Sequence, residues 1–184
     1  RYDDFSDFDG QFSGRAALAW TATDATTVRT SFGTGYRAPS LYERFGPYSG
    51  PDLAPETSRS FDLGVEHRIG ETAMLRATAF YIEIDNLIQY STATSSYAQV
   101  PGTTASKGLE LSGSYSFSDR LSFTGNYTYT LAKNDGVRLA RVPRHELSMA
   151  ADFDVTDRLS STLRVTHVAD VLDGFGTLTP LADY

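Results

Sequence analysis

Apolar and polar residues alternate with a period of two along most of this chain. In the clearest stretch, Leu121, Phe123 and Tyr127 fall on one side of an extended backbone, while Ser122 and Thr124 fall on the other. Such alternation predicts half-buried β-strands, because successive side chains of a strand point to opposite faces. The pattern predicts about eight strands, over residues 12–22, 27–36, 58–69, 73–84, 107–117, 121–131, 145–155 and 159–168.

The connections between these strands are alternately short and long. The short ones are residues 23–26, 70–72, 118–120 and 156–158; the long ones are 37–57, 85–106, 132–143 and 169 onward. Short turns at one end and long loops at the other are typical of an all-β, antiparallel up-and-down transmembrane β-barrel, with the short turns periplasmic and the long loops extracellular. A water-soluble β-sandwich has the same strand periodicity and remains an alternative, but it does not account for the loop asymmetry.

Composition agrees with a membrane barrel. No run approaches the roughly 18 consecutive apolar residues of a membrane-spanning helix, and a barrel needs none because only alternate residues face lipid. The 11 tyrosines and 11 phenylalanines suit strands. Tyr36, Tyr81, Tyr127 and Tyr129 stand near strand ends, where an interfacial aromatic girdle is expected. Cysteine is absent, which excludes disulfides and thiol chemistry within the chain.

Charge and motifs exclude several function classes. A net charge of −7 argues against a nucleic-acid partner. Asp3, Asp4, Asp7 and Asp9 offer oxygen atoms to a cation such as Ca²⁺, but no ligand spacing repeats; we interpret them as a solvated loop and predict no metal site.

The sequence also gives little support to catalysis. It contains neither a Gly-x-Ser-x-Gly elbow nor a His-x-x-x-His spacing. His67 and His167 share the side of the apolar residues in their strands. We therefore predict no catalytic residue and no enzyme.

Aromatic and arginine side chains concentrate in the long loop that follows the second predicted strand. Together they could bind a polar, conjugated ligand by stacking and charge. Alternatives for each are packing within the loop, over the barrel mouth, or a place in the aromatic girdle. The candidate ligand-binding residues are Tyr36, Arg37, Tyr42, Arg44, Phe45, Tyr48, Tyr90 and Tyr97.

Five segments resemble those of TonB-dependent outer-membrane receptors, in that family's order. Residues 33–41 (GTGYRAPSL) resemble its GxxFRAPSL segment, and residues 51–58 (PDLAPETS) the NPxLKPExS box. Gly50 and Ala54 stand where the family often has Asn and Lys. The remaining matches are AFYIEIDNLI at 79–88 with xFYxxIxNLI, KGLEL at 107–111 with xGxEL, and RVPRH at 141–145 with RxPxH.

The resemblance implies a 22-stranded barrel with an N-terminal plug, located in the bacterial outer membrane. Residues 1–184 then form a partial barrel domain from the C-terminal part of the barrel, a fragment with the plug and last strands absent. The implied function is active import of a large, scarce nutrient, in which extracellular loops capture the ligand and TonB drives rearrangement of the plug. The RAPSLYERFG segment favours cobalamin, with a ferric siderophore as the close rival.

The implied partners are TonB, through the missing N-terminal part, the ligand and outer-membrane lipid; no bound cofactor is required. Two other classes remain open. One is a stand-alone small outer-membrane barrel with a structural or adhesive role. The other is a soluble β-sandwich binding module.

Overall fold

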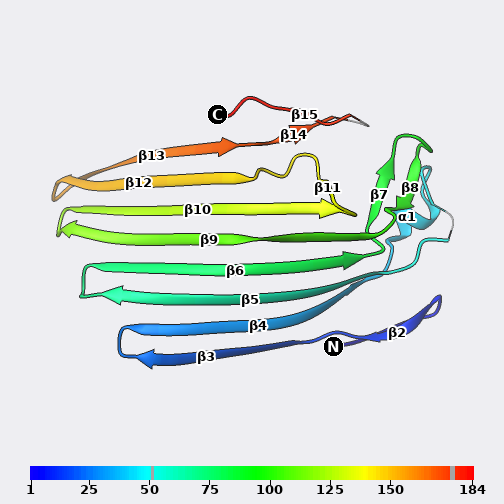
Figure 1. The fold of residues 1–184 in the computed structure, drawn as a ribbon, viewed down its shortest axis with the longest axis horizontal. Coiled ribbons are helices and arrows are strands. Elements are labelled where there is room, and N and C mark those ends of the chain that lie inside the picture. Colours follow the sequence, from blue (N-terminus) through cyan, green and yellow to red (C-terminus); the bar gives the residue numbers. More distant parts are fainter. Residues whose placement is uncertain (51, 175–176) are drawn as a thin grey trace.

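The computed structural model describes residues 1–50, 52–174 and 177–184, and its main feature is one antiparallel sheet. Eight long strands follow one another across it in the order β13-β12-β10-β9-β6-β5-β4-β3, so that neighbours in sequence are neighbours in space (Figure 1). The long strands are β3 (Arg15–Thr23), β4 (Thr26–Arg37), β5 (Glu56–Ile69), β6 (Ala73–Asp85), β9 (Thr103–Ser118), β10 (Leu121–Asn134), β12 (His145–Thr156) and β13 (Leu159–Ala169). Each predicted strand is confirmed.

The tight turns all lie at one end of the sheet, on the left in Figure 1. Three of them share a local structure in which a hydroxyl accepts a hydrogen bond from the backbone N–H two residues later. The acceptors are Thr23, Ser118 and Thr156, each at 3.3 Å from the donor nitrogen. Ser and Thr favour turns because they can bond the backbone in this way. The fourth turn instead uses Gly70, which has φ of +60°.

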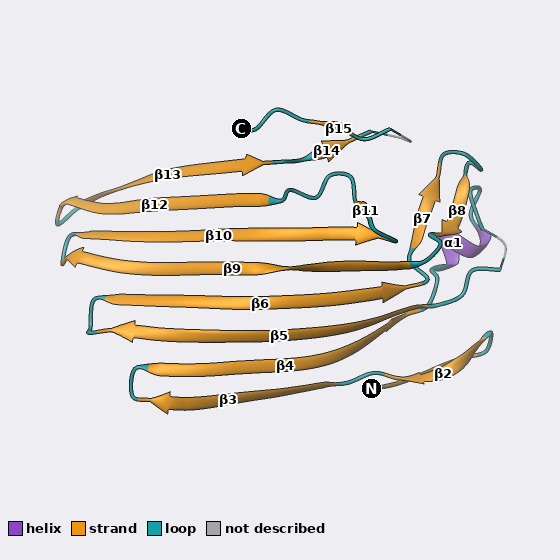
Figure 2. Cartoon of the chain, viewed as in Figure 1, coloured by secondary structure: helices purple, strands orange, loops and turns teal. Residues whose placement is uncertain are grey.

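The N-terminal hairpin and the long connections lie at the other end and contain small elements of their own. They comprise the hairpin of β1 (Tyr2–Phe5) and β2 (Phe8–Phe12), the helix α1 (Leu41–Phe45), the hairpin of β7 (Ile88–Ser91) and β8 (Ser96–Gln99), β11 (Val137–Arg138), and the pair β14 (Leu172–Asp173) and β15 (Thr179–Pro180). Figure 2 shows α1 beside β7 and β8 at this end.

Two details of the sequence interpretation were wrong here. The acidic start is not a loop, because Asp3 and Asp4 lie in β1 and Asp9 lies in β2. In addition, Phe12 closes this first hairpin, so the first long strand begins only at Arg15. Pro51, part of the second motif, lies outside the described residues.

One face of the sheet is apolar from edge to edge. Val65 lies opposite Val28 on β4 and Ala77 on β6, and Ala77 in turn lies opposite Leu111 on β9. These side chains are largely uncovered: Trp20 on β3 is 62% exposed and Leu163 on β13 is 69% exposed. An apolar face of this extent must contact lipid or another apolar surface to be stable.

The opposite face is polar and carries bonded charges. On β3, β4 and β5, the Arg15 guanidinium donates to the Ser31 hydroxyl at 3.0 Å, and this hydroxyl donates to the Asp62 carboxylate at 2.7 Å. Farther along β5 and β6, Arg76 donates to Glu66 at 2.5 Å. Apolar-out and polar-in alternation is the arrangement of a barrel wall whose interior is wet.

The sheet is a single, unclosed layer. Strands β3 and β13 form its two edges and do not pair with each other. Within the described residues no second sheet packs on the apolar face, which contradicts the β-sandwich alternative. Buried apolar residues are correspondingly few. In the described part of the chain, no helix is long and apolar enough to cross a membrane.

Candidate ligand-binding site

The helix α1 begins at a complete capping box. The Ser40 hydroxyl accepts the Glu43 backbone N–H at 3.2 Å, and the Glu43 carboxylate accepts the Ser40 N–H at 2.6 Å. These reciprocal bonds satisfy two of the helix N-terminal donors. The helix ends at Phe45, and the N–H of the capping residue Gly46 donates to the Tyr42 carbonyl at 2.9 Å.

Arg37, the last residue of β4, connects this helix to two strands. Its guanidinium donates to both Glu43 carboxylate oxygens, at 3.2 and 3.1 Å, and to both Glu56 oxygens, at 2.5 and 2.7 Å. Glu56 also accepts the backbone N–H of Ile88 at 2.7 Å. Burial raises the pKa of Glu43, but hydrogen bonds from Ser40 and Arg37 outweigh it, so the pKa lies below its usual value. The Arg37 side chain is therefore engaged in holding the loops in place.

Arg44 connects α1 to the first hairpin. Its guanidinium donates to the Asp7 carboxylate at 2.6 Å and lies 4.9 Å from the ring centroids of both Phe8 and Phe45. These are distances at which a cation is attracted by an aromatic face. The hydrogen bond from Arg44 lowers the pKa of Asp7 below its usual value.

Four tyrosines from two separate loops form a continuous cluster. The Tyr42 and Tyr97 rings lie 6.0 Å apart, Tyr97 and Tyr90 5.8 Å, and Tyr90 and Tyr48 5.8 Å, all edge to face. This is the favoured geometry of aromatic pairs. Tyr42, Tyr48 and Tyr90 remain 51%, 48% and 45% exposed, so their faces are accessible from solvent. We call these four residues the tyrosine cluster.

Close backbone contact holds the two loops of the cluster together. The Tyr97 N–H donates to the Tyr48 carbonyl at 2.8 Å. Gly50 lies beside this bond, and a Cβ built on it would stand 2.0 Å from the Tyr97 carbonyl oxygen. Only glycine allows the two backbones to approach in this way.

The predicted ligand-binding residues therefore separate into four groups. Tyr42, Tyr48, Tyr90 and Tyr97 form the cluster, and Arg44 and Phe45 lie against the first hairpin. Arg37 is bound by two carboxylates. Tyr36 stands apart, with its ring 6.0 Å from that of Phe5, and its hydroxyl is buried without a hydrogen-bond partner among the described residues.

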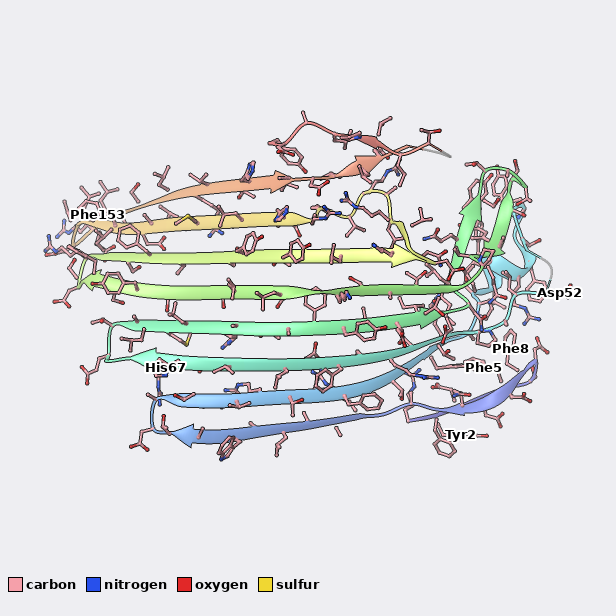
Figure 3. All side chains as sticks on the ribbon, viewed as in Figure 1. Tyr2, Phe5, Phe8, Asp52, His67 and Phe153 are labelled. Atoms are coloured by element: carbon pink, nitrogen blue, oxygen red, sulfur yellow. The ribbon has the colours of Figure 1, made fainter. Side chains whose placement is uncertain are left out.

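Sequence reasoning missed an open hollow between the first hairpin and the loop after α1. It has a volume of about 940 Å³, and its lining includes Asp7, Asp9, Asp52, Arg44 and Tyr36. Figure 3 shows Phe5, Phe8 and Asp52 at this end of the sheet and His67 and Phe153 toward the other. The acidic residues near the start of the chain were the feature of the sequence that pointed to this hollow, because Asp7 and Asp9 line it. They had been interpreted as a solvated loop.

Among the described residues, no histidine lines the hollow. In residues 1–50, 52–174 and 177–184, no group of three or more His, Asp or Glu residues could hold a metal ion. His145 is 2.7 Å from the Tyr127 hydroxyl, and His67 is 2.8 Å from the Thr26 hydroxyl. His167 lies opposite Leu147 in the register, on the apolar face.

Comparison with protein families gives one match over nearly the whole chain. Residues 1–183 match the model described as TonB dependent receptor-like, beta-barrel. Among curated proteins, the vitamin B12 transporter BtuB of Vibrio cholerae serotype O1 is 28% identical over 116 residues. That alignment covers 62% of this chain but only 19% of the relative, so the chain spans about a fifth of its length.

Solved structures share the fold. The siderophore receptor PirA from Pseudomonas aeruginosa superposes with a TM-score of 0.78 at 24% identity, covering 91% of this chain and 32% of that one. The ferric enterobactin receptor PfeA from the same organism, solved with enterobactin, gives 0.76 at 21%, covering 95% and 32%. The copper transporter OprC gives 0.74 at 23%, covering 88% and 26%.

Proposed function

This chain belongs to the TonB-dependent receptor β-barrel family, a family of outer-membrane proteins, and we propose that it forms part of the barrel of a receptor that imports a large, scarce nutrient under the drive of TonB. The nutrient is cobalamin or a ferric siderophore. BtuB is named for vitamin B12, and PirA and PfeA for siderophores. The family is one of receptors, and we propose no enzymatic step.

The domain proposal rests on coverage and topology. The chain covers 26–32% of the three solved structures, and its sheet is an unclosed arc. We propose that residues 1–184 are one section of a larger barrel, with the plug and the TonB-binding segment belonging to other parts of the complete protein.

The tyrosine cluster is the observation that supports the ligand-binding proposal. A cobalamin or a siderophore presents flat conjugated groups, and half-exposed tyrosine rings bury such groups at a small cost in side-chain entropy. Arg44 and Phe45 extend this surface toward the hollow. Arg37 is assigned a positioning role, since both partners of its guanidinium are protein carboxylates.

The test uses the complete protein in detergent with two probes, cobalamin and ferric enterobactin. We expect Tyr42→Ala with Tyr97→Ala to weaken binding of the recognised probe by about tenfold or more, because one ring from each of the two loops is lost. Calorimetry measures the dissociation constants.

Tyr115→Ala serves as the matched control. Tyr115 lies on β9 near the short turns, far along the strand from the loops, and should leave binding unchanged. Equal affinity of the loop variant and the unaltered protein would remove the tyrosine cluster from the site. Uptake that persists in cells lacking TonB would contradict the proposed energy source.

A further inference from the structure

The only two lysines of the chain lie close together on the apolar face. Lys107 on β9 is opposite Leu131 of β10, and Lys133 of β10 is opposite Ala105 of β9. The two lysines are thus diagonal neighbours, a separation of about 7–8 Å between positions on one face of an antiparallel pair. Both side chains are exposed.

Both lysines lie at the border of the apolar band that is nearer to the long loops. Toward the short turns, the outward positions of β9 are Leu109 and Leu111. In the row of Lys107 stand Phe61 and Tyr81, and in the next row toward the loops stands Arg59, opposite Glu83. Apolar residues therefore give way to charged ones at this level, as at the interface of a bilayer.

Among the described residues, neither lysine is bonded to a protein anion. The residues directly opposite Lys107 are Tyr81 and Leu131. In the part of the chain that the structure describes, neither ammonium group makes an ion pair or a hydrogen bond. Glu83 is diagonal to Lys107, but its carboxylate accepts the Tyr81 hydroxyl. Two unpaired like charges on neighbouring strands repel each other unless an anion lies between them.

A third cation lies beside the lysine pair. Arg138 of β11 is opposite Lys133, and its guanidinium binds Asp170 at 2.8 Å. Arg144 binds the same carboxylate at 2.7 Å. One carboxylate therefore serves two guanidinium groups, which adds to the excess of positive charge around the two lysines.

We propose that Lys107 and Lys133 form a binding site for the phosphate group of an outer-leaflet lipid. The long loops of an outer-membrane barrel are extracellular, so this border faces the outer leaflet. A lysine there can lay its methylene chain on the apolar surface and extend its ammonium group to headgroup level. Each lysine contributes attraction to a net anionic headgroup, whereas the phosphate of phosphatidylcholine is already balanced by the quaternary ammonium of the same headgroup. The proposal depends on the outer-membrane location and not on the identity of the imported ligand.

The experiment measures lipid binding to the complete protein by native mass spectrometry. Phosphatidylglycerol and phosphatidylcholine are titrated into the delipidated protein in detergent. We expect Lys107→Gln with Lys133→Gln to weaken phosphatidylglycerol binding by at least about tenfold and to leave phosphatidylcholine binding unchanged. Lys107→Arg with Lys133→Arg, which keeps both charges, should retain binding.

The control is Arg158→Gln with Arg164→Gln. This variant also removes two positive charges, Arg158 from a short turn and Arg164 from the polar face. Both side chains are exposed. An equal loss in this control, or no loss in the lysine variant, would overturn the proposal. Inorganic phosphate that binds the delipidated protein as tightly as phosphatidylglycerol does would also overturn it, since the site would then take free phosphate and not a lipid. All four positions are exposed, and a barrel gel shift in each variant confirms folding.

Discussion

At the scale of single residues, the structure of the long loops depends on a few residues that no other residue type can replace. Arg37 joins α1, β5 and the start of β7 through Glu43 and Glu56. Gly50 allows the backbone contact between two loops that support the tyrosine cluster. We infer that both residues act by positioning the loops.

Gly50→Ala tests this close approach. The added methyl group would meet the Tyr97 carbonyl oxygen, so the loops must separate, at a cost of about 1–3 kcal/mol. We expect faster hydrogen exchange at the Tyr97 amide and weaker ligand binding. Gly14→Ala is the control, because nothing lies within 4 Å of the new Cβ. Unchanged exchange at Tyr97 would show that the contact does not hold the loops.

Acid should release α1 before it affects the strands. Because the pKa of Glu43 is lowered in the folded protein, its charge stabilises the fold above the usual value of 4.5 and this contribution is lost as pH falls through the lowered pKa. Hydrogen exchange at α1, corrected for the intrinsic rate, should rise in this window. Glu43→Gln should reduce the pH dependence and leave the part that comes from Glu56 and Asp7, whose pKa values are also lowered. An unchanged pH dependence in that variant would assign the transition to these other groups.

At the scale of elements, the strands could be predicted from the sequence, whereas the structure of the loops could not. A strand's alternation is local, so β10 could be predicted from its own residues. The pairing of Tyr42 with Tyr97 depends on how two distant loops pack, which no local pattern encodes. The helix α1 was missed although Ser40 and Glu43 carry the spacing of a capping box, because it is only five residues long. The first hairpin was also missed, because its two strands are short and their Asp residues interrupt the apolar alternation.

A matched pair of charge insertions tests the two faces of β9. Leu111 lies mid-strand on the apolar face, and Ser112 is its neighbour on the polar face. In the complete protein folded in vesicles, Leu111→Arg should lower the free energy of unfolding by about 2–4 kcal/mol. Ser112→Arg should change it by only about 0.5 kcal/mol. Urea titration followed by tryptophan fluorescence measures both, and equal costs would contradict the lipid-facing assignment.

At the scale of the whole molecule, the sheet is incomplete by itself. The edges at β3 and β13 present unpaired backbone groups, which lipid does not tolerate. The apolar face would likewise be exposed in water. Under the proposed function, further strands of a closed barrel would join each edge and remove both conditions.

Residues 1–184 produced alone should therefore associate. Refolded in detergent, they are expected to form dimers or larger species through edge pairing, as measured by size exclusion with light scattering. A Lys substitution at an outward edge position, Leu163→Lys, should reduce this association relative to Thr162→Lys on the polar face. A monodisperse, strand-rich monomer would mean that the arc closes on itself.

The four tight turns also bear on the order in which the chain folds. Each joins two long strands after only two or three residues, so closing these loops costs little entropy. Four hairpins with low contact order can form early and independently, whereas pairing between hairpins must wait for loops that are many residues longer. We expect the short-turn end of the sheet to be organised first, and the long-loop end with the tyrosine cluster to be the last part of this chain to become native.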